Sequence, residues 1–244
     1  MTSSHDNSGA VEVGLPASTV LPAGVPPLTD QTRAEAREII ARYPRSRSAL
    51  LPMLHLVQSV QGYVSPQGVA LCAEELGLTK AEVSAVATFY TMYRHKPAGT
   101  YHVGVCTNTL CAVLGGDAIF DAVKDQAGIG NNETTADGTV SIEHIECNAA
   151  CDYAPVVMVN WEFYDGQTPQ SARALVDALR AGEPPAPTRG PKTLSTFKEV
   201  ARVLAGYNDG RGAEGVSAGP ASLAGLELAK ERGDTAPPYP VKGA

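Results

Sequence analysis

The spacing of four of the five cysteines constrains this chain more than any other feature. Four residues separate Cys106 from Cys111, three separate Cys147 from Cys151, and another 35 lie between the two pairs. Four thiolates that converge on one point need something to bind. A [2Fe–2S] cluster takes four cysteine thiolates and is the strongest candidate, in which case the chain carries single electrons.

The spacing and surroundings of the cysteines distinguish a cluster from two alternatives, a zinc site and a dithiol redox site. A structural zinc ion also accepts four cysteines at spacings such as these, so zinc stays open. Zinc modules of this kind are usually small and basic, however, whereas these cysteines lie in an acidic chain with enough apolar sequence for a core. A dithiol oxidoreductase requires C-x-x-C, which the sequence lacks. Small residues such as Ala149 and Ala150 let backbone N–H groups approach the sulfurs, which favours the cluster.

Composition narrows the class of protein further. The chain has 244 residues, a net charge of −7 and a pI near 5.2, which argues against a large nucleic-acid interface. No stretch approaches the ~20 apolar residues that span a bilayer, and the polar N-terminus does not resemble a signal peptide. We therefore expect a protein of the reducing cytosol, where clustered thiols are more often ligands than disulfides.

The sequence gives little support for a complete active site. Gly128-Ile129-Gly130 begins like a dinucleotide-binding loop, but position 133 is Glu133, and a helix rather than a strand is expected before the loop. The sequence contains no P-loop motif, and no Ser/His/Asp set can be identified in it. Cys72 falls on the apolar face of a predicted helix, the ordinary place for a buried free cysteine. We expect no catalytic residue on this chain.

The chain divides into four segments by composition and periodicity. Residues 1–28 are rich in Ser, Gly and Pro, which indicates a mobile arm. Residues 29–97 have helical periodicity and are expected to form a helical bundle. Capping residues mark its helix boundaries: Thr32 with Glu35, Ser65, Thr79 with Glu82, Gly62 and Gly77. Residues 182–244 return to Pro- and Gly-rich sequence with amphipathic pieces near 197–204 and 223–229, and we expect them to dock a partner.

Residues 98–181, the remaining segment, carry a strand pattern. Apolar residues alternate with His102 and Gly104 in a strand that leads to Cys106. A helix expected from Asp117 follows, then further strands and a last helix, in the order β-α-β-β-β-α or close to it. Both cysteine pairs fall just beyond strand ends, where a rigid sheet holds side chains accurately. The pattern predicts an α+β fold, with the helical bundle followed by a mixed-sheet domain.

Several motifs together resemble a known family. They are VATFYTMY at 86–93, VCTN at 105–108 and ECNAACDYAP at 146–155, with supporting matches at 48–62 and 62–66. These motifs resemble the E subunit of bacterial NADH–quinone oxidoreductase, the small [2Fe–2S] subunit in the peripheral arm of respiratory complex I. The likeness extends over about residues 30–180 of the sequence.

The resemblance implies a thioredoxin-like [2Fe–2S] ferredoxin domain after the helical bundle. It implies that Cys106 and Cys111 hold one iron of a single [2Fe–2S] cluster, and that Cys147 and Cys151 hold the other. Pro155 lies where thioredoxin-like folds often have a cis-proline, and the sequence leaves its isomer open.

The resemblance also implies partners. FMN and NADH are expected on a partner subunit, and further iron–sulfur and membrane subunits on a proton-translocating complex that reduces quinone. The chain is then a peripheral electron-transfer subunit on the cytoplasmic side of the membrane. The same module also serves NAD-linked hydrogenases and formate dehydrogenases, and one sequence does not separate these alternatives.

Overall fold

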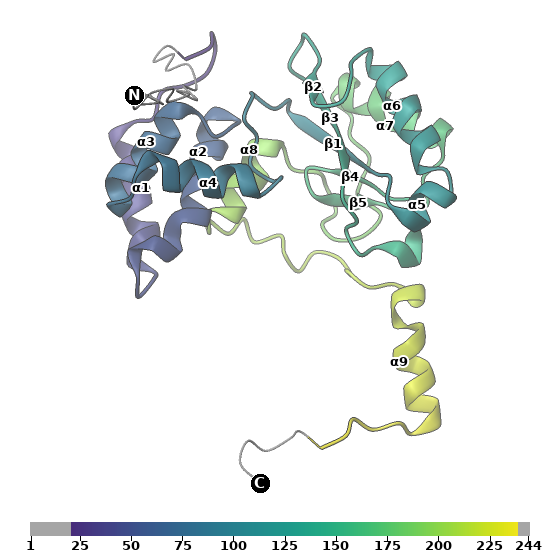
Figure 1. Ribbon diagram of the computed structural model, residues 1–244. Coiled ribbons are helices and arrows are strands. Elements are labelled where there is room, and N and C mark those ends of the chain that lie inside the picture. Colours follow the sequence, from purple (N-terminus) through teal and green to yellow (C-terminus); the bar gives the residue numbers. More distant parts are fainter. Residues whose placement is uncertain (1–20, 239–244) are drawn as a thin grey trace, which may run out of the picture.

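The computed structural model describes residues 21–238, so residues 1–20 of the arm expected over 1–28 lie outside the described part. Figure 1 shows a block of helices beside a sheet, with α8 (Phe197–Leu204) between the two and α9 (Pro220–Arg232) standing apart from both. No helix of the described part combines the length and apolar character needed to cross a membrane. The predicted α+β class is confirmed, while the boundaries of the four predicted segments remain predictions.

The helical block has starts and ends that follow from local sequence. Its elements are α1 (Asp30–Ala41), η1 (Ser46–Ala49), α2 (Leu50–Gln61), α3 (Pro66–Leu76) and α4 (Lys80–Phe89). Ser65 caps α3, and Thr79 with Glu82 forms the predicted capping box of α4. Gly62 and Gly77 end α2 and α3 in the left-handed conformation that favours glycine, also as predicted.

The first helix begins earlier than the sequence predicts. Thr29 is its N-cap, because the Thr29 hydroxyl accepts a hydrogen bond from the N–H of Thr32 and the Thr32 hydroxyl accepts one from the N–H of Thr29. The predicted pairing of Thr32 with Glu35 is wrong. The carboxylate of Glu35 instead forms an ion pair with Arg202 of α8, at 2.8 Å.

The sheet has five strands in the order β2-β3-β1-β4-β5. The strands are β1 (Tyr101–Cys106), β2 (Glu133–Thr134), β3 (Val140–Ile145), β4 (Val157–Val159) and β5 (Glu162–Tyr164). β1 and β3 run parallel, and the other neighbours run antiparallel. Because parallel strands end at the same edge of a sheet, the loops that follow β1 and β3 meet there. Cys106 is the last residue of β1, and Cys147 lies in the loop that follows β3.

One face of the sheet is covered by α6 (Gly116–Ala127) and α7 (Pro169–Ala181), on the side away from the helical block (Figure 1). Val103 and Val105 of β1 share this face and join one apolar core with Ile119 of α6. Side chains alternate along β1, so one face of the strand packs on α6 and α7 and the other is turned toward the helical block.

The helix expected to begin at Asp117 has a different start. A short helix, α5 (Thr109–Val113), comes first, and α6 then follows Gly115, whose φ of +105° favours glycine. A Cβ at Gly116 would lie 2.6 Å from the carbonyl oxygen of Cys106, so glycine is also needed for close packing there. Neither helix has a side-chain hydrogen bond at its N-cap.

The other face of the sheet is joined to the helical block by α8 (Phe197–Leu204). Phe197 is fully buried, with ring contacts to His102 of β1 and to Trp161. The ammonium group of Lys198 donates to the carbonyl of Val60 in α2, at 3.0 Å. The predicted amphipathic piece at 197–204 is thus a helix that packs within its own chain.

Candidate metal centre

Cys106 and Cys111 form the buried half of the candidate site, and we call them the inner pair. Cys106 is the last residue of β1, and its N–H donates to the carbonyl of Val156 at 3.2 Å. Cys111 lies in α5. Each is only 3% exposed, and both belong to a small apolar cluster with Ala150, Val156 and Met158. The sheet edge and this cluster hold the inner pair in a dry environment.

Cys147 and Cys151, the outer pair, lie on the loop after β3 and are exposed. Their Sγ atoms are 3.6 Å apart. Two thiolates bound tetrahedrally to one metal at about 2.3 Å lie about 3.7 Å apart, so this separation suits two ligands of the same metal. Ala149 adopts φ +55°, and its N–H donates to Sγ of Cys147 at 3.4 Å. Such N–H···S hydrogen bonds are among the features that set iron–sulfur potentials.

The structure brings all four predicted site cysteines together. They line one small cavity with three other residues: Cys106, Cys111, Cys147, Cys151, Asn148, Ala150 and Val156. Yet nowhere in residues 21–238 do three His, Cys, Asp or Glu side chains gather closely enough to hold one metal ion. A tetrahedral zinc ion needs all four thiolates around one point, whereas a binuclear cluster needs two pairs. Four cysteine thiols around one cavity are the ligand set that a [2Fe–2S] cluster takes.

The polar groups around the cavity also fit a sulfur-rich cluster. Nδ2 of Asn148 is buried and has no hydrogen-bond partner among the described residues. Buried donors are normally paired, and a cluster provides sulfur acceptors in this cavity. Asn108 donates to the carbonyl of Ile145 at 3.1 Å, which ties the loop after β1 to the end of β3. The sequence predicted small residues near the sulfurs and did not single out the Asn148 amide.

Two thiols of the site, those of Cys111 and Cys151, have raised pKa values in the metal-free chain. Burial, together with the neighbouring Cys106 thiol, raises the pKa of the Cys111 thiol to about 11. A hydrogen bond with Cys147 raises the pKa of the Cys151 thiol above its usual value. Metal centres bind the thiolate form, so loading this site releases protons.

The loop that carries the outer pair, which we call the outer loop, is contacted by residues 188–222. We call this segment the C-terminal strap. Arg189 forms a bridge with Phe163 at the edge of β5 and pairs with Asp165 at 3.0 Å. Its guanidinium lies over the rings of Phe163 and Tyr153, 4.2 and 5.3 Å from their centroids. Tyr153 belongs to η2 (Cys151–Tyr153), the turn that carries one outer cysteine.

The end of the strap contacts the same turn directly. The Tyr153 hydroxyl accepts from the N–H of Ala221 at 3.2 Å, and the Ser222 hydroxyl donates to the Asp152 carboxylate. Ala221 and Ser222 open α9 (Pro220–Arg232), which has no buried residue and otherwise projects away from the body (Figure 1). No pattern in the sequence indicates that the C-terminal segment reaches the cysteine loop.

The fifth cysteine lies elsewhere. Cys72 is fully buried in the core of the helical block, and burial raises the pKa of its thiol to about 12. This placement agrees with the prediction of a buried free cysteine. His102 is also buried and bonds Glu143 of the neighbouring strand β3 at 3.0 Å.

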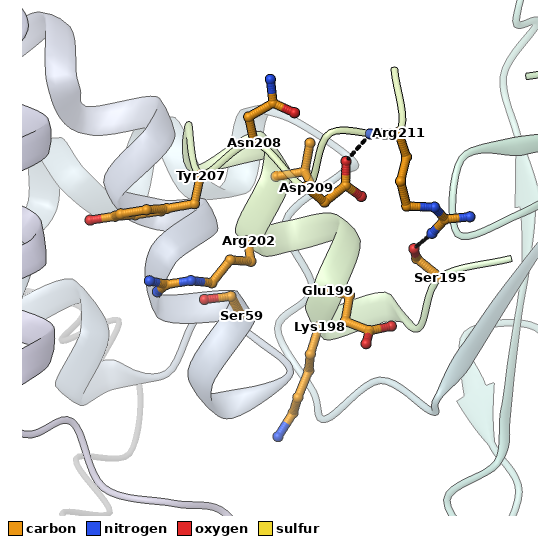
Figure 2. Close-up of a pocket in the computed structure, with 10 residues that line it drawn as sticks. Ser59, Ser195, Lys198, Glu199, Arg202, Tyr207, Asn208, Asp209 and Arg211 are labelled. Carbon is orange, nitrogen blue, oxygen red and sulfur yellow. Dashed lines mark hydrogen bonds between the residues drawn. The ribbon is translucent and has the colours of Figure 1, made fainter. Parts of the chain in front are cut away.

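A larger hollow of about 510 Å³ lies beside α8 and carries no comparable chemistry. Figure 2 shows Arg211 turned toward Ser195, with Arg202 and Tyr207 on the side of the helical block. Arg202 is paired with Glu35 and stacks 3.9 Å from the centroid of Tyr207. The residues that line this hollow include no cysteine or histidine. Its charged groups stabilise the junction around α8.

Comparison with known proteins defines the class. The family model of the thioredoxin-like [2Fe-2S] ferredoxin matches residues 36–180. The chain therefore belongs to the thioredoxin-like [2Fe–2S] ferredoxin family, which confirms the predicted cofactor, one [2Fe–2S] cluster. The Ala154–Pro155 peptide bond, whose isomer the sequence left open, is cis.

The relatives are more specific. The chain is 59% identical over 221 residues to the E subunit of NADH-quinone oxidoreductase from Mycobacterium tuberculosis, covering 90% of this chain and 87% of the relative. It is 38% identical over 149 residues to NADH-quinone oxidoreductase subunit 2 of Thermus thermophilus, covering 60% and 82% of the two chains. The predicted resemblance to the E subunit is thereby confirmed.

A solved structure shares the fold. The NAD+-reducing [NiFe]-hydrogenase in its air-oxidized state matches with a TM-score of 0.50 and 22% identity, over 55% of this chain and 23% of the hydrogenase chain. At this identity the likeness concerns the fold alone.

Proposed function

We propose that this chain is the electron-transferring E subunit of an NADH–quinone oxidoreductase. Its one [2Fe–2S] cluster is held by Cys106, Cys111, Cys147 and Cys151. The observation that carries the proposal is the meeting of these four thiols in one small cavity, within a domain of the [2Fe–2S] family. The assignment to this complex rests on the relatives, which are named as subunits of NADH-quinone oxidoreductase.

The two pairs divide the ligands between the irons. The inner pair holds one iron within the apolar cluster at the sheet edge, and the outer pair holds the other at the protein surface. The Sγ separation of 3.6 Å in the outer pair supports ligation of a single iron by these two thiolates. When bound, the cluster takes up and returns one electron at a time.

The residues around the cluster govern access and potential. The inner apolar cluster excludes water on one side, and the Ala149 N–H donates to a ligand sulfur on the other. Exposed Glu146 and Asp152 flank the outer pair, and their charges disfavour an added electron, although solvent screens them.

The exposed side of the site faces the electron-exchange partner. Three large apolar residues, Leu110, Val113 and Leu114, are exposed beside Cys111. Exposed apolar residues next to a metal site suit a protein interface. We assign it to the subunit that binds FMN and NADH, in a peripheral assembly on the cytoplasmic side of the membrane. The hydrogenase and formate dehydrogenase settings are less favoured, because the relatives with 38–59% identity are subunits of quinone oxidoreductases, whereas the hydrogenase shares only the fold at 22% identity.

The test separates the cluster-bearing chain from its partner. The purified full chain with its cluster should not oxidise NADH, and NADH should not produce the EPR signal of the reduced cluster. Addition of the FMN-binding subunit should produce that signal. Robust NADH oxidation by this chain in the absence of a flavoprotein would overturn the division of labour.

A further inference from the structure

We propose that the side-chain amide of Asn148 donates a hydrogen bond to a sulfur of the [2Fe–2S] cluster and thereby raises the reduction potential of the cluster. The inference rests on the proposed function, because it takes the cluster to lie among the four cysteines. It assigns to Asn148 the role of a positioning and tuning residue beside the metal ligands.

The first observation is an unsatisfied buried donor. Nδ2 of Asn148 is shielded from solvent and has no hydrogen-bond partner among residues 21–238. Leaving such a group unpaired is costly, so native proteins provide acceptors for nearly all buried donors. A group bound in the cavity would supply the acceptor that the described residues do not provide.

The second observation is the position of the amide. Asn148 lines the same small cavity as all four cysteines. The neighbouring wall consists of Ala150 and Val156, whose side chains cannot accept a hydrogen bond. The acceptors that a bound cluster brings to this cavity are sulfurs carrying negative charge. Such acceptors select the NH2 end of the amide, because the carbonyl end would be repelled.

The backbone of the loop provides a second donor beside the first. Ala149 is left-handed, with φ +55°, and its N–H points to Sγ of Cys147. Consecutive residues of the outer loop therefore present a side-chain donor and a backbone donor to the site. This is the pattern by which proteins surround iron–sulfur clusters with hydrogen bonds.

The direction of the effect follows from charge. Reduction adds one negative charge to the cluster, and a hydrogen-bond donor stabilises the more negative state more strongly. Removal of the donor should therefore lower the potential. The exposed carboxylates of Glu146 and Asp152 act in the opposite direction to Asn148, but water and salt screen them, whereas the Asn148 amide nitrogen is buried.

The experiment compares Asn148→Leu with Asn131→Leu in the full chain carrying its cluster. Leucine has a similar size and no donor. Asn131 lies before β2, where its side chain accepts from the N–H of His144, so its variant controls for loss of an asparagine near the same strand end. An EPR-monitored redox titration should give a lower potential for Asn148→Leu, by about threefold in the reduction equilibrium, which is ~28 mV at 59 mV per tenfold change. Asn131→Leu should leave the potential unchanged.

A spectroscopic readout tests the contact itself. Pulsed EPR of the reduced wild-type chain in D2O should show an exchangeable proton coupling that Asn148→Leu lacks. If the leucine variant does not load a cluster, Asn148→Ala takes its place in both measurements. An unchanged potential together with an unchanged proton coupling would overturn the role of Asn148. A wild-type chain that holds zinc or no sulfide would instead overturn the proposed function, so the two failures are distinguishable.

Discussion

The inner and outer cysteine pairs differ in almost everything except their proximity. Cys106 and Cys111 are 3% exposed and are held by a strand end, a short helix and an apolar cluster. Cys147 and Cys151 are exposed on a loop that the distant C-terminal strap contacts. The comparison shows how one site combines two requirements: burial fixes the geometry of one half, and exposure gives the other half access to a partner.

The difference predicts unequal effects of ligand substitution. Cys111→Ser places a hydroxyl in the apolar half of the site, and we expect iron occupancy to fall by at least about tenfold. Cys147→Ser should abolish or strongly alter the EPR spectrum of the reduced cluster, but with higher residual iron, because the exposed loop can adjust. Iron analysis and EPR on the two purified variants measure this. Equal occupancy in both would remove the distinction between the pairs, and an unchanged spectrum of Cys147→Ser would contradict its assignment as a ligand.

Acid can remove the cluster in two ways, by unfolding the chain or by opening the loop that carries the outer pair. The pH dependence of the free energy of unfolding distinguishes them. Burial lowers the pKa of His55 in α2 to about 4, below the value of 6.5 expected in the unfolded chain. The unfolded chain therefore binds this proton first, and stability falls as the pH drops from 6.5 toward 4, by up to about 3 kcal/mol.

The variant His55→Leu should lose less stability over this pH range than the wild type. Denaturant unfolding of the metal-free chain at pH 7 and pH 4.5 measures the difference. An equal loss in both chains would show that His55 does not carry this dependence. Acid-induced cluster loss that persists in a folded His55→Leu chain would point to the outer loop.

We expect the C-terminal strap to slow the loss of the cluster by restraining the outer loop. Arg189→Gln removes an ion pair and stacking on Tyr153, worth about 1–2 kcal/mol. We expect a chelator to remove the cluster about 5- to 30-fold faster if this energy holds the outer loop closed. Arg173→Gln on α7, which breaks an exposed pair with Asp125 of α6, is the matched control and should behave like the wild type. Identical rates for Arg189→Gln and wild type would mean that the strap does not restrain the loop.

The smallest effect on the cluster is expected from Cys72 in the helical block. Cys72→Ser replaces a fully buried thiol that lies in a different core from the cysteine site. Stability should fall by about 1–3 kcal/mol because a hydroxyl is buried, while the EPR spectrum of the cluster should stay the same. A changed spectrum would show that Cys72 acts on the cluster.

Local features of the fold were predictable because they depend on a few neighbouring residues. Ser65, Thr79 and Thr168 each begin a helix through a hydrogen bond that their own side chain makes. The start of α6 was missed because its cap, Gly115, makes no such bond. The Thr32 capping pair was wrong because a second threonine three residues earlier offers the same chemistry.

The site was predictable only in part. Spacing and motif predicted which cysteines come together, since two strands of one sheet bring their following loops to one edge. Spacing contains no information on which pair is buried, because Val156 and Met158 close over the inner pair only in the folded chain. The contacts of Arg189 and Asn148 likewise depend on tertiary packing. The assignment of the four cysteines as ligands remains a prediction that experiment must test.

The most direct measurement is metal and sulfide analysis of the natively isolated chain. The account predicts about two iron atoms and two inorganic sulfide ions per chain, with an EPR signal that appears on reduction. About one zinc ion per chain with no inorganic sulfide would contradict it.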